Sequence, residues 1–267
     1  MPDVSGLDTN PARSVLGCNE SKNTGIESTS VPIYASSMGL IVFAASMLSE
    51  IPYAVMVLGV VLVGLWISNV LYDLKVPHYL SRKVGHGAGG VGFLLCGCLF
   101  SSAFWPIALS GSFALVLSGA RIFKPGTFRG VGGSGRVGNV KSEVWFAAIG
   151  VPVFAVGWLW LDRPFVAVSC LLFMAWGDCL TGLVRYRVYG KPVKGLWGSV
   201  AMLAVCLVVA AAFLRPFWIG AFGAVVAVIT ERLFGDVGIV KWADDNWAIP
   251  VASLACILIL LALTQSS

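Results

Sequence analysis

Charged side chains are scarce in this chain of 267 residues, where Lys, Arg, Asp and Glu together make up only 12%. An ordinary soluble domain carries about 25% of these residues. The chain is also 58% hydrophobic, with a mean hydropathy of +0.87. This balance excludes a typical water-soluble domain and indicates an integral membrane protein.

The sequence has only two histidines, and none of its seven cysteines forms a Cys-x-x-Cys pair. This spacing argues against a zinc site or a disulfide framework. No basic tract with interleaved aromatic residues lies outside the apolar runs, so we expect no nucleic-acid partner. The net charge of +5 is better explained by membrane topology. Most cysteines lie inside apolar runs, where Cys behaves as a small hydrophobe: Cys96, Cys98, Cys170, Cys206 and Cys256.

The chain divides into a polar start and a long apolar remainder. Residues 1–30 are rich in Ser, Thr, Asn and Gly and lack an apolar period, which predicts a disordered cytosolic tail. Residues 31–267 read as one multi-span membrane catalytic domain. The predicted fold is therefore an all-α polytopic helical bundle of about nine transmembrane helices. The segments with suitable length and hydropathy are 32–48, 53–72, 85–104, 106–120, 143–161, 164–180, 196–214, 217–234 and 248–264.

The cations are distributed unevenly between the two sets of connections. Sixteen of the 18 Lys and Arg residues lie in the tail and in the links after the second, fourth, sixth and eighth segments; Arg163 and Arg215 are left for the opposite side. Such a bias marks the cytosolic face. We therefore expect the tail and all the basic links to face the cytosol, where nucleoside triphosphates are found.

The first candidate motif is Arg82-Lys83-Val-Gly-His86. If a helix begins near Ser81, both cations share a face with His86, at spacings of four and three residues. Two cations and an imidazole at the membrane rim suit a clamp on phosphates. Alternatively, Arg82 and Lys83 anchor the topology and His86 packs at the interface. The motif alone does not decide between these readings.

The second candidate is the run from Gly177 to Ser199, which lies between two apolar segments. Asp178 ends the first segment, and an acid among several Lys and Arg suits a metal-bound polyphosphate. The alternative is a positive-inside loop with an ordinary Asp at a helix end. The next segment opens with Gly198-Ser199, where free backbone N–H groups can receive a phosphate. The candidate phosphate-binding residues of this run are Lys191, Lys194, Gly198 and Ser199.

The third candidate is acidic and precedes the last apolar segment. Asp244, Asp245 and Asn246 offer carboxylate and amide oxygens, which are ligands that Mg²⁺ prefers. Glu231 ends the segment before them. The alternative is helix capping, because Asp or Asn just before a helix satisfies its free N–H groups.

Taken in this order, the motifs resemble the polyprenol kinase family, which includes dolichol kinase, phytol kinase and CTP-dependent diacylglycerol kinase. The resemblance covers about residues 75–264. It rests on an Arg-Lys-x-x-His motif, a Gly-Asp segment that runs on to Lys-x-x-x-Gly-Ser, and a late Asp-Asp-Asn. The matching residues are Arg82, Lys83, His86, Gly177, Asp178, Gly190, Lys194, Gly198, Ser199, Asp244, Asp245 and Asn246.

The resemblance implies a kinase that phosphorylates a membrane lipid alcohol at the cytosolic rim, with CTP as the donor. The residues themselves do not separate CTP from ATP. Phosphoryl transfer needs mostly positioning and charge neutralisation. Asp178, Asp244, Asp245 and Asn246 are then candidate Mg²⁺ ligands, and Arg82, Lys83, Lys191 and Lys194 candidate phosphate ligands. Either Asp178 or His86 serves as the catalytic base.

Two rival functions stay open at this point. Assembly of the protein as a homodimer is also open. A CDP-lipid synthase of the phosphatidate or archaeol type also consumes CTP, and shares a similar late acidic and basic pattern. A membrane transporter would place its ionisable groups near the bilayer midplane. The groups here instead gather at one rim, so a transporter ranks third.

Overall fold

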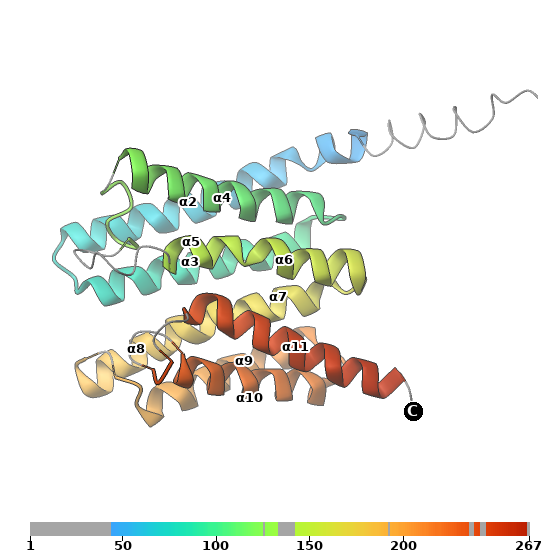
Figure 1. Cartoon of the computed structure of the whole chain (residues 1–267). Coiled ribbons are helices and arrows are strands. Elements are labelled where there is room, and N and C mark those ends of the chain that lie inside the picture. The colour runs from blue at the N-terminus through green and yellow to red at the C-terminus, as the bar shows by residue number, and fades with distance from the viewer. Residues whose placement is uncertain are drawn as a thin grey trace, which may run out of the picture. The chain divides into compact units, whose positions relative to one another are not determined.

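The computed structural model describes residues 44–124, 126–132, 142–191, 193–234, 238–240 and 244–265. The predicted tail and most of the predicted span 32–48 lie outside this part of the chain. Every secondary-structure element named within this part of the chain is a helix (Figure 1). Six of its helical segments are long and apolar enough to cross a membrane. These findings confirm the prediction of an all-α membrane protein.

Within the described part of the chain, the helices from α2 onward form eight rods. Two rods are built from several consecutive elements, because π-helical turns interrupt them or end them. The bounds are α2 (Ile51–Asp73), α3 (His78–Leu99), α4 (Phe104–Phe123), α5 (Ser142–Ala148) with α6 (Gly150–Ala155) and η1 (Val156–Trp160), α7 (Pro164–Leu172) with η2 (Phe173–Gly177) and α8 (Asp178–Tyr189), α9 (Leu196–Phe213), α10 (Phe217–Leu233) and α11 (Asp245–Gln265).

Two predicted segments differ from the observed helices. The prediction 85–104 is shifted, because α3 runs from His78 to Leu99 and begins directly after Pro77. The first turns of α3 carry polar side chains on a buried face, and a hydropathy window does not recognise them. The prediction 164–180 is too short, because the rod continues through α8 to Tyr189. Gly190 ends it in the left-handed conformation at φ 65°, a common helix stop.

The rod α7–η2–α8 lies at the centre of the bundle. In the most apolar window of this rod 78% of the residues are buried, against at most 39% for the other five candidate spans. On one side it packs against α3, which pairs with α2. On the other side it contacts α9 and α11, which join α10 (Figure 1). The core around it includes the fully enclosed side chains Phe154, Phe173, Met174, Met202 and Ile249.

Four helices end and four begin at the same end of the bundle, here called the basic end (Figure 1). There α2 leads to α3, α4 to α5, α8 to α9, and α10 to α11. Part of the link after α4 is fastened to this end, because Asn69 Nδ2 donates to the Thr127 carbonyl at 2.8 Å and Ser81 Oγ to the Gly130 carbonyl at 3.1 Å. The fold therefore gathers the starts of α3, α9 and α11 beside the end of α8.

Candidate active site

Asp178 lies where α3 crosses the central rod. Its Oδ2 is 2.5 Å from Lys83 Nζ and 3.1 Å from His86 Nδ1. All three side chains are buried. Lys83 and His86 reach the same carboxylate because they are three positions apart and so lie on one face of α3. The stem of Lys83 passes over Gly182, where an added Cβ would lie 2.9 Å from Lys83 Cγ.

A π-helical turn, η2, comes directly before Asp178. It separates α7 from α8 within one continuous rod, and so changes the direction in which α8 presents its side chains. Single π-turns inside α-helices are often found at functional sites. Gly177 ends this turn, and its missing side chain leaves room for Met202 and Cys206 of α9.

Glu231 of α10 forms a second buried ionic group with Arg185, which lies about two turns after Asp178 on α8. Arg185 binds its two carboxylate oxygens side by side, at 2.8 and 2.9 Å. Lys194 Nζ lies 2.5 Å from Glu231 Oε1 and also donates to the Glu231 backbone carbonyl. The Glu231 side chain is only 1% exposed. A bidentate pair with a further cation satisfies this buried carboxylate.

Asp245 connects the two groups. Its Oδ2 is 3.6 Å from Lys194 Nζ, and one oxygen each of Asp178, Glu231 and Asp245 lie within 4.8 Å of one another. We call these three the carboxylate cluster. Its members come from α8, α10 and α11, and three cations face them: Lys83, Lys194 and Arg185. Asp245 is the most exposed member, with 22% of its side chain accessible, so the cluster opens to solvent on its side.

A polar centre around Ser142 lies at the start of α5. Arg82 donates to Ser142 Oγ, and Asn246 Nδ2 donates to both its Oγ at 2.6 Å and its carbonyl at 3.0 Å. Two buried atoms of this centre, Arg82 Nε and Asn246 Oδ1, have no hydrogen-bond partner among the described residues. Buried polar atoms are usually paired, so these two are free for a polar ligand.

The predicted metal residues thus separate in space. Asp245 belongs to the carboxylate cluster, together with Asp178. Asp244 instead accepts the backbone N–H of Asn246 at 2.9 Å, which is a capping contact at the start of α11. The Asn246 side chain turns to Ser142. In this arrangement Asp245 belongs to the carboxylate cluster, whereas Asp244 and Asn246 make other contacts.

The start of α9 carries the remaining predicted phosphate ligands. Gly198 packs against the Arg185 side chain, where a Cβ would lie 2.7 Å from Cγ. Ser199 is buried, and its Oγ has no partner among the described residues. Lys191 is exposed at the rim, away from the carboxylate cluster's ion pairs. Gly198 therefore makes room for the Arg185–Glu231 pair, and Ser199 and Lys191 remain available.

Sequence reasoning undervalued Glu231 and Arg185. The sequence places Glu231 beside the acids that follow it and Arg185 at helical spacing from Asp178, but it does not pair the two. A signal for Glu231 was present: it is the one acid within the otherwise apolar stretch of α10. An ionisable residue in such a stretch needs a buried partner, and Arg185 is that partner.

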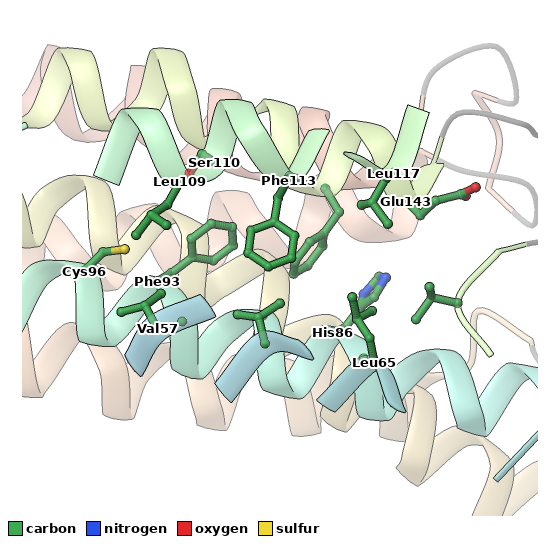
Figure 2. A pocket seen from close by; sticks show the side chains of 17 residues that line it. Val57, Leu65, His86, Phe93, Cys96, Leu109, Ser110, Phe113, Leu117 and Glu143 are labelled. Atoms are coloured by element: carbon green, nitrogen blue, oxygen red, sulfur yellow. The ribbon is translucent and has the colours of Figure 1, made fainter. Parts of the chain in front are cut away.

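An apolar cavity adjoins His86 on the side away from α8. It lies between α2, α3, α4 and α5 and has a volume of about 70 Å³. In Figure 2 His86, Leu117 and Glu143 stand near one end, and Cys96, Leu109 and Ser110 near the other. His86 therefore contacts Asp178 of the ionic group and also lines the apolar cavity.

Comparison with known proteins gives two similar sequences. Phytol kinase of Synechocystis sp. is 30% identical over 196 residues, which cover 66% of this chain and 77% of that protein. Probable phytol kinase 2, chloroplastic, of Oryza sativa subsp. japonica is 25% identical over 206 residues, which cover 65% of this chain and 64% of that protein. No family model and no solved structure matches the chain. The similarity over most of both the first relative and the membrane domain shows that this chain belongs to the polyprenol kinase family, alongside phytol kinase.

Proposed function

We propose that this protein transfers the γ-phosphoryl group of CTP to the hydroxyl group of a membrane isoprenoid alcohol. One observation carries the proposal: His86 and Asp178 join a charge-balanced carboxylate cluster to an apolar cavity. The cluster suits a metal-bound polyphosphate, and the cavity suits a lipid. The two similar proteins are phytol kinases, which supports a lipid alcohol as the acceptor.

The donor set of the carboxylate cluster fits Mg²⁺. Three carboxylates offer hard oxygen ligands close together, and a site on this rim leaves positions for phosphate oxygens. Asp178, Glu231 and Asp245 would hold the ion. When bound, Mg²⁺ supplies neutralisation of the charge on the transferring phosphoryl group. Lys83, Lys194 and Arg185 already balance the negative charge of the three carboxylates. A bound Mg²⁺ would therefore add net positive charge, which an anion such as a nucleotide would neutralise.

Cations around the cluster are suited to hold the nucleotide phosphates. Lys83 and Lys194 already lie at the carboxylates, within reach of an anion bound there. Arg82 has a buried Nε without a partner among the described residues, and a guanidinium binds phosphate oxygens in a planar fork. The exposed Lys191 adds charge at the rim.

His86 is the base that the geometry favours. Asp178 contacts Nδ1, which orients the ring and leaves Nε2 to take the proton of the acceptor hydroxyl. In the transfer, the alcohol oxygen forms a bond to the γ-phosphorus and the bond from that phosphorus to the β–γ bridging oxygen breaks. The products are a lipid phosphate and CDP, and the proton goes to His86.

The basic end is proposed to face the cytosol. The cation bias supports this orientation, because sixteen of 18 Lys and Arg residues belong to that side and its tail. Cysteine introduced at the exposed Lys191 should react with an impermeant thiol reagent only from the cytosolic side. Cysteine introduced at Arg163, in the link between η1 and α7, should react only from the other side. Labelling of both from the same side would contradict the orientation.

Double labelling of CTP tests the reaction. Purified protein in lipid micelles, given Mg²⁺ and phytol, should move label from the γ-phosphate of CTP to the lipid, and none from the α-phosphate. Transfer of the α-phosphate would instead identify a cytidylyltransferase. ATP, GTP and UTP at equal concentration should support less transfer than CTP. Equal use of ATP would remove CTP specificity and leave the kinase assignment standing.

A further inference from the structure

The apolar cavity has the proportions of a channel rather than of a packing defect. Its lining along α3 extends from His86 to Cys96. Ten residues at a rise of about 1.5 Å each give a length of about 15 Å. Voids larger than a water molecule are few in protein interiors. With a volume of about 70 Å³, this cavity is larger than a single water molecule, and its lining is almost wholly apolar.

The walls of the cavity are polar only at its ends. Among the described residues that line it, only His86, Glu143 and Ser110 have nitrogen or oxygen in their side chains. Glu143 is already paired with Arg121. His86 is therefore the polar lining residue that can bind a ligand near the basic end. Ser110 lies at the opposite end, beside Leu109 (Figure 2). A ligand with one polar head and a long apolar tail matches this arrangement.

The cavity lies between two helix pairs that contact each other only sparsely. α2 packs closely on α3, and α4 packs on α5 and α6, whereas α2 and α4 touch at few points. These two helices lie next to each other in Figure 1, with the surface of the bundle beside them. We call the line between them the α2–α4 seam. An apolar chain can pass through it from the bilayer without crossing the ionic side.

We propose that this cavity is the acceptor-chain site: the hydroxyl of a single-chain isoprenoid alcohol lies at His86, the first part of its chain fills the cavity, and the remainder leaves through the α2–α4 seam. This inference rests on the proposed function. C–C bonds of about 1.52 Å meeting at about 111° advance about 1.25 Å per carbon. A cavity of about 15 Å therefore takes about twelve main-chain carbons, or three isoprene units.

The same geometry disfavours an acceptor with two acyl chains. Diacylglycerol carries two ester groups immediately beside its hydroxyl, so they would fall among the apolar walls next to His86. The wall residues there include Gly85, Gly89 and Phe146, none of which has a side-chain hydrogen-bond donor. Burying an ester carbonyl without a donor is unfavourable. The cavity thus selects for one slender chain.

A matched pair of substitutions on α4 tests the site by chain length. Leu109→Trp fills the far end of the cavity, whereas Leu115→Trp makes the same change at a position that is 75% exposed on the same helix. In Leu109→Trp we expect the KM for a 20-carbon prenol to rise about tenfold or more, and that for a ten-carbon prenol to stay within about twofold. Leu115→Trp should alter neither. Equal changes for both alcohols, or no change for either, would overturn the proposal.

A binding measurement separates this inference from the proposed function. A prenol with a diazirine near its hydroxyl is photolysed with the Asp178→Asn variant, which does not need to turn over. Cross-links competed by unlabelled phytol should map to cavity residues near His86, such as Phe146 and Leu117. Cross-links confined to the outer faces of α2 and α4 would overturn the site even if the wild-type protein is an active kinase. If no alcohol is phosphorylated but the cavity is labelled, the proposed function fails and the chain site stands.

Discussion

The two sides of α3 differ in how they are filled. Toward α8, α10 and α11, every carboxylate of the cluster touches a cation: Asp178 meets Lys83, and Glu231 meets Arg185 and Lys194. Toward α2 and α4, the same helix borders a chamber with apolar walls and unfilled space. On one side of α3 the buried charges are paired, and on the other side the apolar space is not filled by side chains.

This difference indicates which changes each side tolerates. Charges buried in pairs depend on both partners, because removing one leaves the other unpaired in a poorly polar interior. An unfilled apolar chamber tolerates changes in volume, which alter only what fits. A reaction between a water-soluble nucleotide and a lipid needs both kinds of surface to meet, and they meet at His86. The predictions below test the ionic side, from the largest expected effect to the smallest.

Asp178→Asn should leave a folded protein with little or no phosphotransfer. Asn has nearly the volume of Asp but lacks the charge that orients His86 and that would bind a metal in the proposed mechanism, so turnover should fall at least 10²-fold. Steady-state transfer from labelled CTP measures this. Asp162→Asn, in the link at the opposite end of the bundle, is the matched control and should retain activity. Near-normal turnover in Asp178→Asn would reduce Asp178 to a structural residue.

Glu231→Gln should lower stability more than other acid-to-amide changes. It leaves the buried Arg185 without a carboxylate, which should cost about 3 kcal/mol of unfolding free energy. Thermal unfolding in detergent measures the loss. Asp73→Asn removes the partner of Arg129 in a pair that is about half exposed, at 52% and 56%, and should change stability little. Equal melting temperatures for the two variants would show that the Arg185–Glu231 pair does not hold α8 to α10.

Arg82→Ala and Lys194→Ala should mainly weaken nucleotide use. Each removes one proposed charge-assisted phosphate contact, which would correspond to about 1.5–3 kcal/mol, or roughly 10- to 150-fold in nucleotide affinity or turnover. CTP titrations at saturating acceptor measure the change. Arg187→Ala, at an exposed position on α8, provides the control. If both variants lose stability and keep the wild-type KM for CTP, the two cations are structural.

Asp245→Asn should raise the Mg²⁺ concentration needed for half-maximal activity about tenfold or more, because the carboxylate cluster loses a ligand. The neighbouring Asp244→Asn should leave this requirement unchanged. Asp244 accepts a backbone N–H at the start of α11, and Asn caps a helix as well as Asp does. A larger shift for Asp244→Asn than for Asp245→Asn would reverse the assignment of metal ligands.

Gly182→Ala should reduce turnover only a few-fold. The new methyl group would lie 2.9 to 3.0 Å from Cγ and Cδ of Lys83, so this flexible side chain must shift its ammonium group relative to Asp178. Gly59→Ala in α2 is the control, because nothing lies within 4 Å of its added methyl group. Identical kinetics for the two variants would mean that the Lys83 position is not critical.

The sequence predicted the class of fold because hydropathy and helix length are local properties. It misplaced the start of α3, since the buried polar face of that helix is visible only when α8 is beside it. It brought Asp178, Lys83 and His86 forward as candidates through their spacing. It could not foresee that Glu231 joins them, or that Asp244 and Asn246 turn away. Those outcomes depend on contacts between helices and on the exact turn at which α11 begins.

The ion pairs also join parts of the chain that are made at different times. Lys83 and Asp178 are 95 residues apart in sequence. At about 5–20 residues per second, the ribosome completes α8 some 5–20 s after α3. Throughout that interval α3 has its lysine and histidine but not the acid that receives them. We therefore expect α3 to settle into the bundle late, so that a nascent chain stopped before α8 would be a ready substrate for membrane quality control.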